Sequence, residues 1–133
     1  MFKSKIDHIS LSVKDIDKSK SFYKSLFVNI LGYKVSLEQE DFLAIDFDGS
    51  FLFEISQENT EFKNSKFDRY QVGLNHFAIS VESVEMVDKL YNNLLELGVE
   101  ILDPPRAYPE YTPNYYAVFY TDPNGFKMEF MFS

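Results

Sequence analysis

The alternation of apolar and polar residues along the chain predicts the same series of elements twice. Residues 5–13 and 74–81 alternate with a period of two, which is typical of a strand with one buried face. Apolar residues at spacings of three and four then predict helices over about residues 16–31 and 84–97. Short apolar segments follow each helix, so we expect two copies of a strand, helix, strand, strand, strand unit.

The two copies also agree at individual positions. The chain has two histidines, His8 and His76, and they occupy matching places in the first strand of each copy, 68 positions apart. Asp15 and Ser83 follow these strands at the same spacing, where short polar side chains are typical of helix N-caps. The matched histidines and helix starts indicate an internal repeat.

The later strands extend the repeat at a growing offset. The segment FLAIDF at residues 42–47 aligns with YYAVFY at 115–120, and FLFEIS at 51–56 aligns with FKMEFM at 126–131. The second copy gains its extra residues in a loop expected at 103–114 and in a longer Asp-Pro-Asn-Gly turn before its last strand. The insertions therefore fall between strands, where they leave both copies intact.

Together these segments predict one domain over residues 1–133 that is built from two modules. Module one spans about residues 5–57 and module two about residues 73–132, with a linker at about 58–72. Hydrophobic residues make up 45% of the 133 residues and aromatic residues 17%, which is enough for a packed core. The order of elements predicts the α+β class.

The charge and composition exclude several classes of function. A net charge of −8 repels phosphate backbones, so we expect no nucleic-acid partner. The chain has no cysteine, which excludes disulfides and thiol catalysis by the protein itself. No apolar segment approaches the length of a membrane span and the first residues lack a signal-peptide pattern, so we expect a cytoplasmic protein without a membrane partner.

Each copy places a histidine and a glutamate on the strand face that points away from its helix. His8 and His76 alternate with the apolar residues of the first strands, and small residues share their face. Glu54 and Glu129 lie in otherwise apolar last strands, where glutamate is unfavourable and is costly to bury without a partner. A divalent cation would compensate two imidazoles and two carboxylates together. The repeat therefore predicts a metal site formed by His8, Glu54, His76 and Glu129.

The chain resembles the vicinal oxygen chelate superfamily, which includes glyoxalase I, fosfomycin-modifying enzymes, extradiol dioxygenases and bleomycin-resistance proteins. The segments that carry the resemblance are DHISLSVKDIDKSKSFYKSLFVNILGYKV, FLFEI, LNHFAISV and DPNGFKMEF, and they extend over nearly the whole chain. The resemblance implies tandem βαβββ modules whose curled mixed sheets surround a cup, with the helices on the outer face. It also implies that His8, Glu54, His76 and Glu129 bind Zn, Ni, Mn, Fe or Co, within one chain or between two chains of a homodimer.

The resemblance further implies a glyoxalase-like lyase or isomerase that chelates neighbouring oxygens of a small substrate and transfers a proton beside a carbonyl. Glu129 would be the proton-transfer residue, and Glu54 is the second candidate. Arg106, Tyr115 and Lys127 are candidate substrate-binding residues. Arg106 and Lys127 offer positive charge. Tyr115 belongs to the tyrosine-rich segment DPPRAYPEYTPNYY, which is either a stiff aromatic lid over the cup or a surface loop whose prolines limit the entropy of the unfolded chain.

Departures from the family pattern leave the activity open. Bacterial members similar to glyoxalase I carry an arginine four residues after the first histidine, where this chain has Ser12, so the use of glutathione stays open. Extradiol dioxygenases use an additional catalytic histidine, which this chain lacks. One alternative is a bleomycin-resistance-like dimer that binds a small molecule or drug without metal or catalysis, for which we would expect degenerate ligand positions. Another is a dioxygenase-like relative. Fosfomycin-modifying relatives use three ligands and surround the substrate phosphonate with basic groups, for which these strands offer only Lys127.

Overall fold

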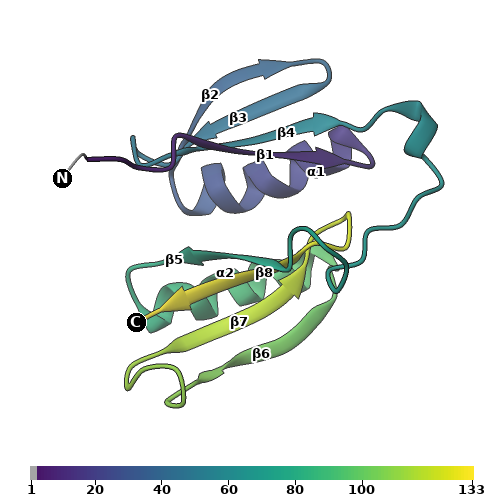
Figure 1. The fold of residues 1–133 in the computed structure, drawn as a ribbon. Coiled ribbons are helices and arrows are strands. Elements are labelled where there is room, and N and C mark those ends of the chain that lie inside the picture. Colours follow the sequence, from purple (N-terminus) through teal and green to yellow (C-terminus); the bar gives the residue numbers. More distant parts are fainter. Residues whose placement is uncertain (1–2) are drawn as a thin grey trace. The chain divides into compact units, whose positions relative to one another are not determined.

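A computed structural model describes residues 3–133, and in it the chain forms two compact units with their boundary between Ser65 and Lys66. Each unit contains one four-stranded mixed sheet with a helix packed on one face (Figure 1). Both units follow the same order of a strand, a helix and three strands. The predicted α+β class and the two βαβββ modules are therefore confirmed.

The first unit is a mixed sheet with the strand order β1-β4-β3-β2. β1 and β4 are parallel neighbours, whereas β3 pairs antiparallel with both β4 and β2. This order places the strands that carry His8 and Glu54 side by side. The elements are β1 (His8–Val13), α1 (Ile16–Tyr23), a π-helix (Lys24–Ile30), β2 (Lys34–Gln39), β3 (Phe42–Asp46), β4 (Leu52–Gln57) and a 3-10 helix (Thr60–Phe62).

The second unit repeats this topology with the strand order β5-β8-β7-β6. β5 is parallel to β8, and β7 pairs antiparallel with both β8 and β6. The strands of His76 and Glu129 are again neighbours. The elements are β5 (His76–Ser80), α2 (Val84–Leu97), β6 (Ile101–Ala107), β7 (Tyr116–Thr121) and β8 (Lys127–Phe132).

Both helices begin at the N-cap residues that the sequence predicts. Asp15 Oδ1 accepts a hydrogen bond from the Lys18 amide at 3.1 Å, and Ser83 Oγ accepts one from the Met86 amide at 3.1 Å. α2 ends at Gly98, whose φ of 70° lies in the left-handed region that favours glycine. Start and stop signals therefore define α2 with its predicted bounds.

The first helix differs from the predicted continuous helix over residues 16–31. After Tyr23 the chain continues as a π-helix, in which the Leu31 amide donates to the Leu26 carbonyl at 3.1 Å. Leu26 and Phe27 are successive residues, and both are fully buried. We attribute the wider turn to this burial, because it allows two adjacent side chains to face the sheet.

The helix side of each sheet forms its core. In the first unit the buried rings of Tyr23 and Phe27 pack on Phe53, with centroid distances of 4.8 and 5.2 Å. In the second unit Leu94 of α2 and Met128 of β8 are fully buried. Exposure alternates along β1 and β5, so the predicted strand faces are confirmed. We call the face that points away from the helix, and that carries the histidine and the glutamate, the ligand face of each module.

The middle strands of the two modules align differently from the predicted repeat. Ala44 pairs with Glu54 and Phe119 pairs with Glu129, so these strands match at an offset of 75 instead of the predicted 73. A shift of two residues keeps every side chain on the same face. The apolar pattern therefore predicts the faces correctly, although it cannot distinguish the two alignments.

Residues 101–107 form strand β6, which corrects the loop predicted at 103–114. The pairing of β6 with β7 shifts between Ile101 and Asp103, and again between Asp103 and Arg106. β6 is the edge strand, where its two prolines are tolerated because one side of the backbone makes no ladder hydrogen bonds. Arg106 therefore lies on a strand, and the loop is confined to residues 108–115.

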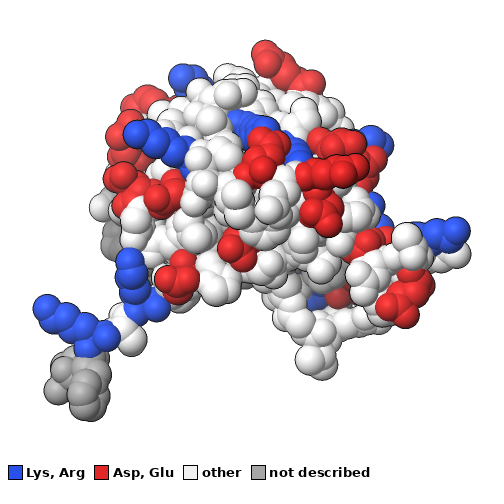
Figure 2. All heavy atoms as spheres, turned by 90° about the horizontal axis from the view of Figure 1, so that it is seen from above, with Lys and Arg blue, Asp and Glu red and all other residues white. Residues whose placement is uncertain are grey.

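Acidic and basic side chains are interspersed over the face seen in Figure 2, in a chain with 21 acidic and 13 basic residues. Lys14 and Glu58 form one half-buried pair, with Nζ and Oε2 3.1 Å apart. Among the helices of residues 3–133, none is long and apolar enough to cross a membrane.

Candidate functional site

Strand register places the predicted histidine and glutamate of module one on neighbouring strands. His8 of β1 pairs with Leu52 of β4, and Glu54 pairs with Ser10. His8 and Glu54 are therefore diagonal neighbours on the ligand face. A hydrogen bond to Asp7 and, next in size, the charge of Glu54 raise the pKa of His8 above its usual value.

Module two repeats this register. His76 pairs with Lys127, and Glu129 pairs with Ala78. The closest approach is between His76 Nε2 and Glu129 Oε2, which are 3.7 Å apart. The sequence repeat is therefore also a repeat of geometry, since each module presents one imidazole and one carboxylate on its ligand face.

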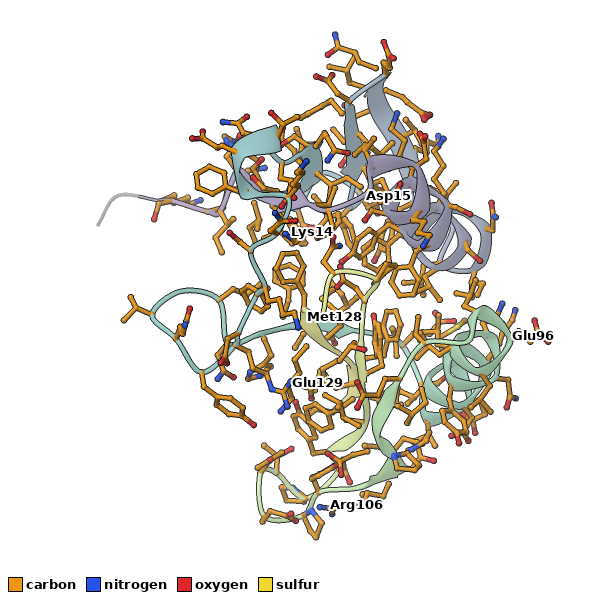
Figure 3. All side chains as sticks on the ribbon, turned by 90° about the vertical axis from the view of Figure 1, so that its right-hand side faces the viewer. Lys14, Asp15, Glu96, Arg106, Met128 and Glu129 are labelled. Atoms are coloured by element: carbon orange, nitrogen blue, oxygen red, sulfur yellow. The ribbon has the colours of Figure 1, made fainter. Side chains whose placement is uncertain are left out.

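Glu129 is the buried member of the module-two pair. This residue is 2% exposed, whereas the His76 side chain is 41% exposed. Glu129 Oε1 accepts a hydrogen bond from the Tyr115 hydroxyl, but the 3.7 Å from Oε2 to His76 is too long for a hydrogen bond. Figure 3 labels Glu129 beside Met128 on β8. The buried carboxylate is thus hydrogen-bonded at one oxygen and faces the imidazole with the other.

Both histidines are held in the same tautomer by the residue that precedes them. His8 Nδ1 lies 2.8 Å from Asp7 Oδ2, and His76 Nδ1 lies 2.7 Å from Asn75 Oδ1. The side-chain nitrogen of Asn75, Nδ2, donates a hydrogen bond to the Arg69 carbonyl at 3.4 Å. This bond orients the side-chain oxygen of Asn75 toward the imidazole. Because both partners are acceptors, each Nδ1 carries a proton. The neutral ring then presents the Nε2 lone pair, which is the form that binds metals.

These donor groups fit a divalent cation. Bonds from a metal to imidazole nitrogen and to carboxylate oxygen are about 2.0–2.2 Å long. The 3.7 Å between His76 Nε2 and Glu129 Oε2 is shorter than two such bonds, so one ion can contact both atoms. Nitrogen and oxygen ligands suit Zn, Ni, Mn, Fe and Co. In the described part of the chain, no three His, Cys, Asp or Glu side chains are grouped to hold an ion. The close approach of 3.7 Å belongs to module two, whereas His8 and Glu54 are neighbours by strand register.

The two candidate cations for substrate binding occupy different places in module two. Lys127 of β8 lies on the ligand face, at the strand position directly opposite His76 of β5. Arg106 lies on β6, and its guanidinium carbon is 3.7 Å from the centre of the Tyr108 ring. Arg106 Nη2 is also 3.6 Å from Glu110 Oε1. Lys127 is therefore beside the His76–Glu129 pair, whereas Arg106 interacts with residues close to it in sequence.

The tyrosines of the 108–115 loop pack against one another, and Tyr115 among them reaches Glu129. The rings of Tyr108 and Tyr111 stack with centroids 5.2 Å apart, and Tyr108 also packs edge-on against Phe119 at 5.5 Å. The sequence predicts Tyr115 as a substrate-binding residue but does not predict its hydrogen bond to Glu129. Period-two alternation through residues 115, 117 and 119 is the signal that would have placed Tyr115 on the same face as Glu129. Burial and the Glu129 carboxylate raise the pKa of Tyr115 well above its usual value, so the hydroxyl stays protonated as the donor.

Comparison with known proteins gives a family match over both modules. The model of the Glyoxalase/Bleomycin resistance protein/Dioxygenase superfamily matches residues 5–130. The uncharacterized protein YqjT of Bacillus subtilis is 33% identical over 122 residues, which cover 92% of this chain and 94% of YqjT. The metallothiol transferase FosB of Lysinibacillus sphaericus is 32% identical over 125 residues, which cover 94% of this chain and 79% of FosB.

Solved structures share the fold over the same length. A Bacillus halodurans protein that was solved as a candidate glyoxalase superposes with a TM-score of 0.82 at 30% sequence identity. The superposition covers 96% of this chain and 95% of that protein. A lactoylglutathione lyase from Agrobacterium tumefaciens superposes with a TM-score of 0.68 at 19% identity, covering 98% of this chain and 95% of that one, which supports the fold alone.

Proposed function

The chain belongs to the Glyoxalase/Bleomycin resistance protein/Dioxygenase superfamily, and on this basis we propose that it is a metal-dependent enzyme acting on a small molecule. Each module contributes one His–Glu pair, and two pairs hold one divalent ion. The two pairs come from one chain or from two chains of a homodimer. The substrate has two neighbouring oxygens and a carbon–hydrogen bond beside a carbonyl. The proposed ligands are His8, Glu54, His76 and Glu129.

The pairing of His76 with Glu129 is the observation that carries this proposal. Burying an ionised carboxylate costs several kcal/mol unless nearby charge and hydrogen bonds compensate it. Glu129 is 2% exposed and has one hydrogen-bonded oxygen, while the other faces an imidazole nitrogen at 3.7 Å. Asn75 holds the proton of that imidazole on Nδ1, which directs the Nε2 lone pair toward the carboxylate. A cation bound to both atoms supplies the charge that this arrangement requires.

The residues of the chain take separate roles in this proposal. A bound divalent ion polarises the substrate oxygens and stabilises the negative charge that develops on them. Glu129 is the first candidate and Glu54 the second to accept the proton from the carbon beside the carbonyl. Lys127, which pairs with His76, is suited to bind an anionic group of the substrate. Arg106 and Tyr115 complete the proposed substrate-binding residues.

A metal-dependent thiol transfer is the second candidate function. The similarity to FosB, a metallothiol transferase, at 32% identity over 94% of this chain favours it. The same His–Glu pairs would hold the metal in either reaction. The two candidate reactions differ in the group that is transferred. The lyase or isomerase moves a proton within one substrate, whereas the transferase adds a thiol to a second molecule.

The metal site is tested by the metal content of protein purified without chelators, measured by mass spectrometry for the wild type and for His76→Ala. We expect bound divalent metal in the wild type and its loss in His76→Ala. Ser80→Ala is the matched control, because Ser80 lies exposed on the same face of β5 as His76. Equal metal content in the wild type and in His76→Ala would overturn the ligand assignment.

The reaction is tested with the metal-loaded wild type and two probes. The glutathione adduct of an α-ketoaldehyde, followed by NMR in D₂O, reports transfer of the proton beside the carbonyl. Fosfomycin with a free thiol, followed by thiol consumption, reports thiol transfer. Turnover of the first probe supports the lyase or isomerase, and turnover of the second supports the transferase. Binding of ligands without turnover of either probe favours the non-catalytic, bleomycin-resistance-like function.

A further inference from the structure

The two oxygens of Glu129 have different surroundings, and the difference depends on Tyr115. The Tyr115 hydroxyl donates a hydrogen bond to Oε1. Oε2 is the oxygen that approaches His76 Nε2, at 3.7 Å. A carboxylate that rotates freely can offer either oxygen, or both, to a cation. A carboxylate whose Oε1 accepts a hydrogen bond offers Oε2.

The 108–115 loop fixes the position of Tyr115 through its backbone and its ring. The Tyr108 amide donates to the Tyr115 carbonyl at 2.8 Å, and the Tyr115 amide donates to the Thr112 carbonyl at 3.1 Å. The Tyr115 ring packs edge-on against Tyr111, with centroids 5.1 Å apart and an interplanar angle of 86°. The hydroxyl therefore reaches Glu129 from a side chain that the loop already holds in place.

Module one has no tyrosine at the position equivalent to Tyr115. β2 ends at Gln39 and β3 begins at Phe42, so a tight turn replaces the loop of module two. At the structural offset of 75, the residue equivalent to Tyr115 is Glu40, which lies in that turn and carries a carboxylate instead of a hydroxyl. The hydroxyl donor is therefore specific to the glutamate of module two.

We infer that Tyr115 is a positioning residue that holds Glu129 as a metal ligand through Oε2, an inference that rests on the proposed function. The hydrogen bond makes the His76–Glu129 pair the fixed half of the site. The His8–Glu54 pair, which has no equivalent tyrosine, is the adjustable half. Hydrogen bonds of this kind to metal-binding side chains typically raise metal affinity by about 10- to 100-fold.

Co(II) is a suitable probe, because its visible absorption depends on the number and arrangement of its ligands. We would titrate the metal-free wild type and Tyr115→Phe with Co(II) and record both the spectrum and the dissociation constant. Phenylalanine keeps the ring packing of the loop and removes the hydroxyl. Tyr111→Phe is the matched control, since Tyr111 is in the same loop, is 58% exposed and also loses a hydroxyl. Circular dichroism would establish that each variant is folded.

We expect Tyr115→Phe to bind Co(II) about tenfold or more weakly, with a changed spectrum because Oε1 becomes available as a second ligand atom. Tyr111→Phe should match the wild type. A wild-type spectrum and affinity for Tyr115→Phe would overturn the positioning role and leave the metal site intact. A wild type that binds no Co(II) would instead overturn the proposed function, and the positioning role with it.

Discussion

Replacing Glu129 with glutamine should stabilise the metal-free protein and remove its stabilisation by metal. Glu129 is 2% exposed, and burying an ionised carboxylate carries a penalty of several kcal/mol. The charge-assisted hydrogen bond from Tyr115 offsets about 1.5–3 kcal/mol of that penalty. Glutamine keeps an oxygen for Tyr115 and removes the charge. We therefore expect metal-free Glu129→Gln to exceed the wild type by about 1–2 kcal/mol in the free energy of unfolding.

Calorimetry in the presence of a chelator measures the stability of the metal-free protein, and calorimetry with saturating Zn(II) measures its stabilisation by metal. For a domain of this size, 1–2 kcal/mol corresponds to a rise in Tm of about 3–8 °C. At a metal concentration of about 100 times Kd, the wild type should gain about 2.7 kcal/mol, and Glu129→Gln should gain far less. Glu96→Gln, an exposed position on α2 that Figure 3 labels, is the control and should behave as the wild type. A metal-free Glu129→Gln that is less stable than the wild type would show that the buried carboxylate is not destabilising. Equal stabilisation of both proteins by Zn(II) would show that Glu129 does not bind the metal.

Tyr116→Phe removes the hydrogen bond, 2.7 Å long, from the Tyr116 hydroxyl of β7 to Asp88 Oδ1 of α2, and urea unfolding should show a loss of about 1–2 kcal/mol. This bond raises the pKa of Tyr116 from 10.0 to about 12, so its stabilisation is complete below pH 10 and is lost as the pH rises through 12. Unfolding free energies measured over that range should therefore fall more for the wild type than for Tyr116→Phe, and parallel curves would contradict the assignment. Phe53→Ala should destabilise the first unit by about 3–5 kcal/mol, because Phe53 is fully buried against Tyr23. A loss of unfolding free energy below about 1 kcal/mol would show that the packing of Phe53 against Tyr23 is not part of the stabilising core.

The topology and the strand faces could be predicted because each depends on a local signal that is repeated in the chain. Period-two alternation assigns His8 and His76 to the faces away from the helices, and the burial along β1 and β5 agrees. Polar N-caps at Asp15 and Ser83 define where the helices begin. These features require no knowledge of which distant residues come into contact.

Features that depend on tertiary packing could not be predicted from the same signals. The π-helix accompanies the burial of both Leu26 and Phe27, and helical periodicity alone gives an α-helix there. Strand β6 contains two prolines, and its position at the sheet edge is what allows it to pair. The contact of Tyr115 with Glu129 joins the loop residue before β7 to the neighbouring strand β8, so it depends on a register that an apolar pattern leaves ambiguous by two residues.

A crystal structure of the Zn(II)-loaded protein, with anomalous data at the zinc edge, would test the roles of the four ligand residues. We expect a zinc peak about 2.0–2.2 Å from His76 Nε2 and from Glu129 Oε2, with the Tyr115 hydroxyl still hydrogen-bonded to Oε1. His8 and Glu54, from the same chain or from a second one, should complete the coordination. A zinc ion bound elsewhere, with His76 and Glu129 unchanged and without metal, would show that these residues are not metal ligands.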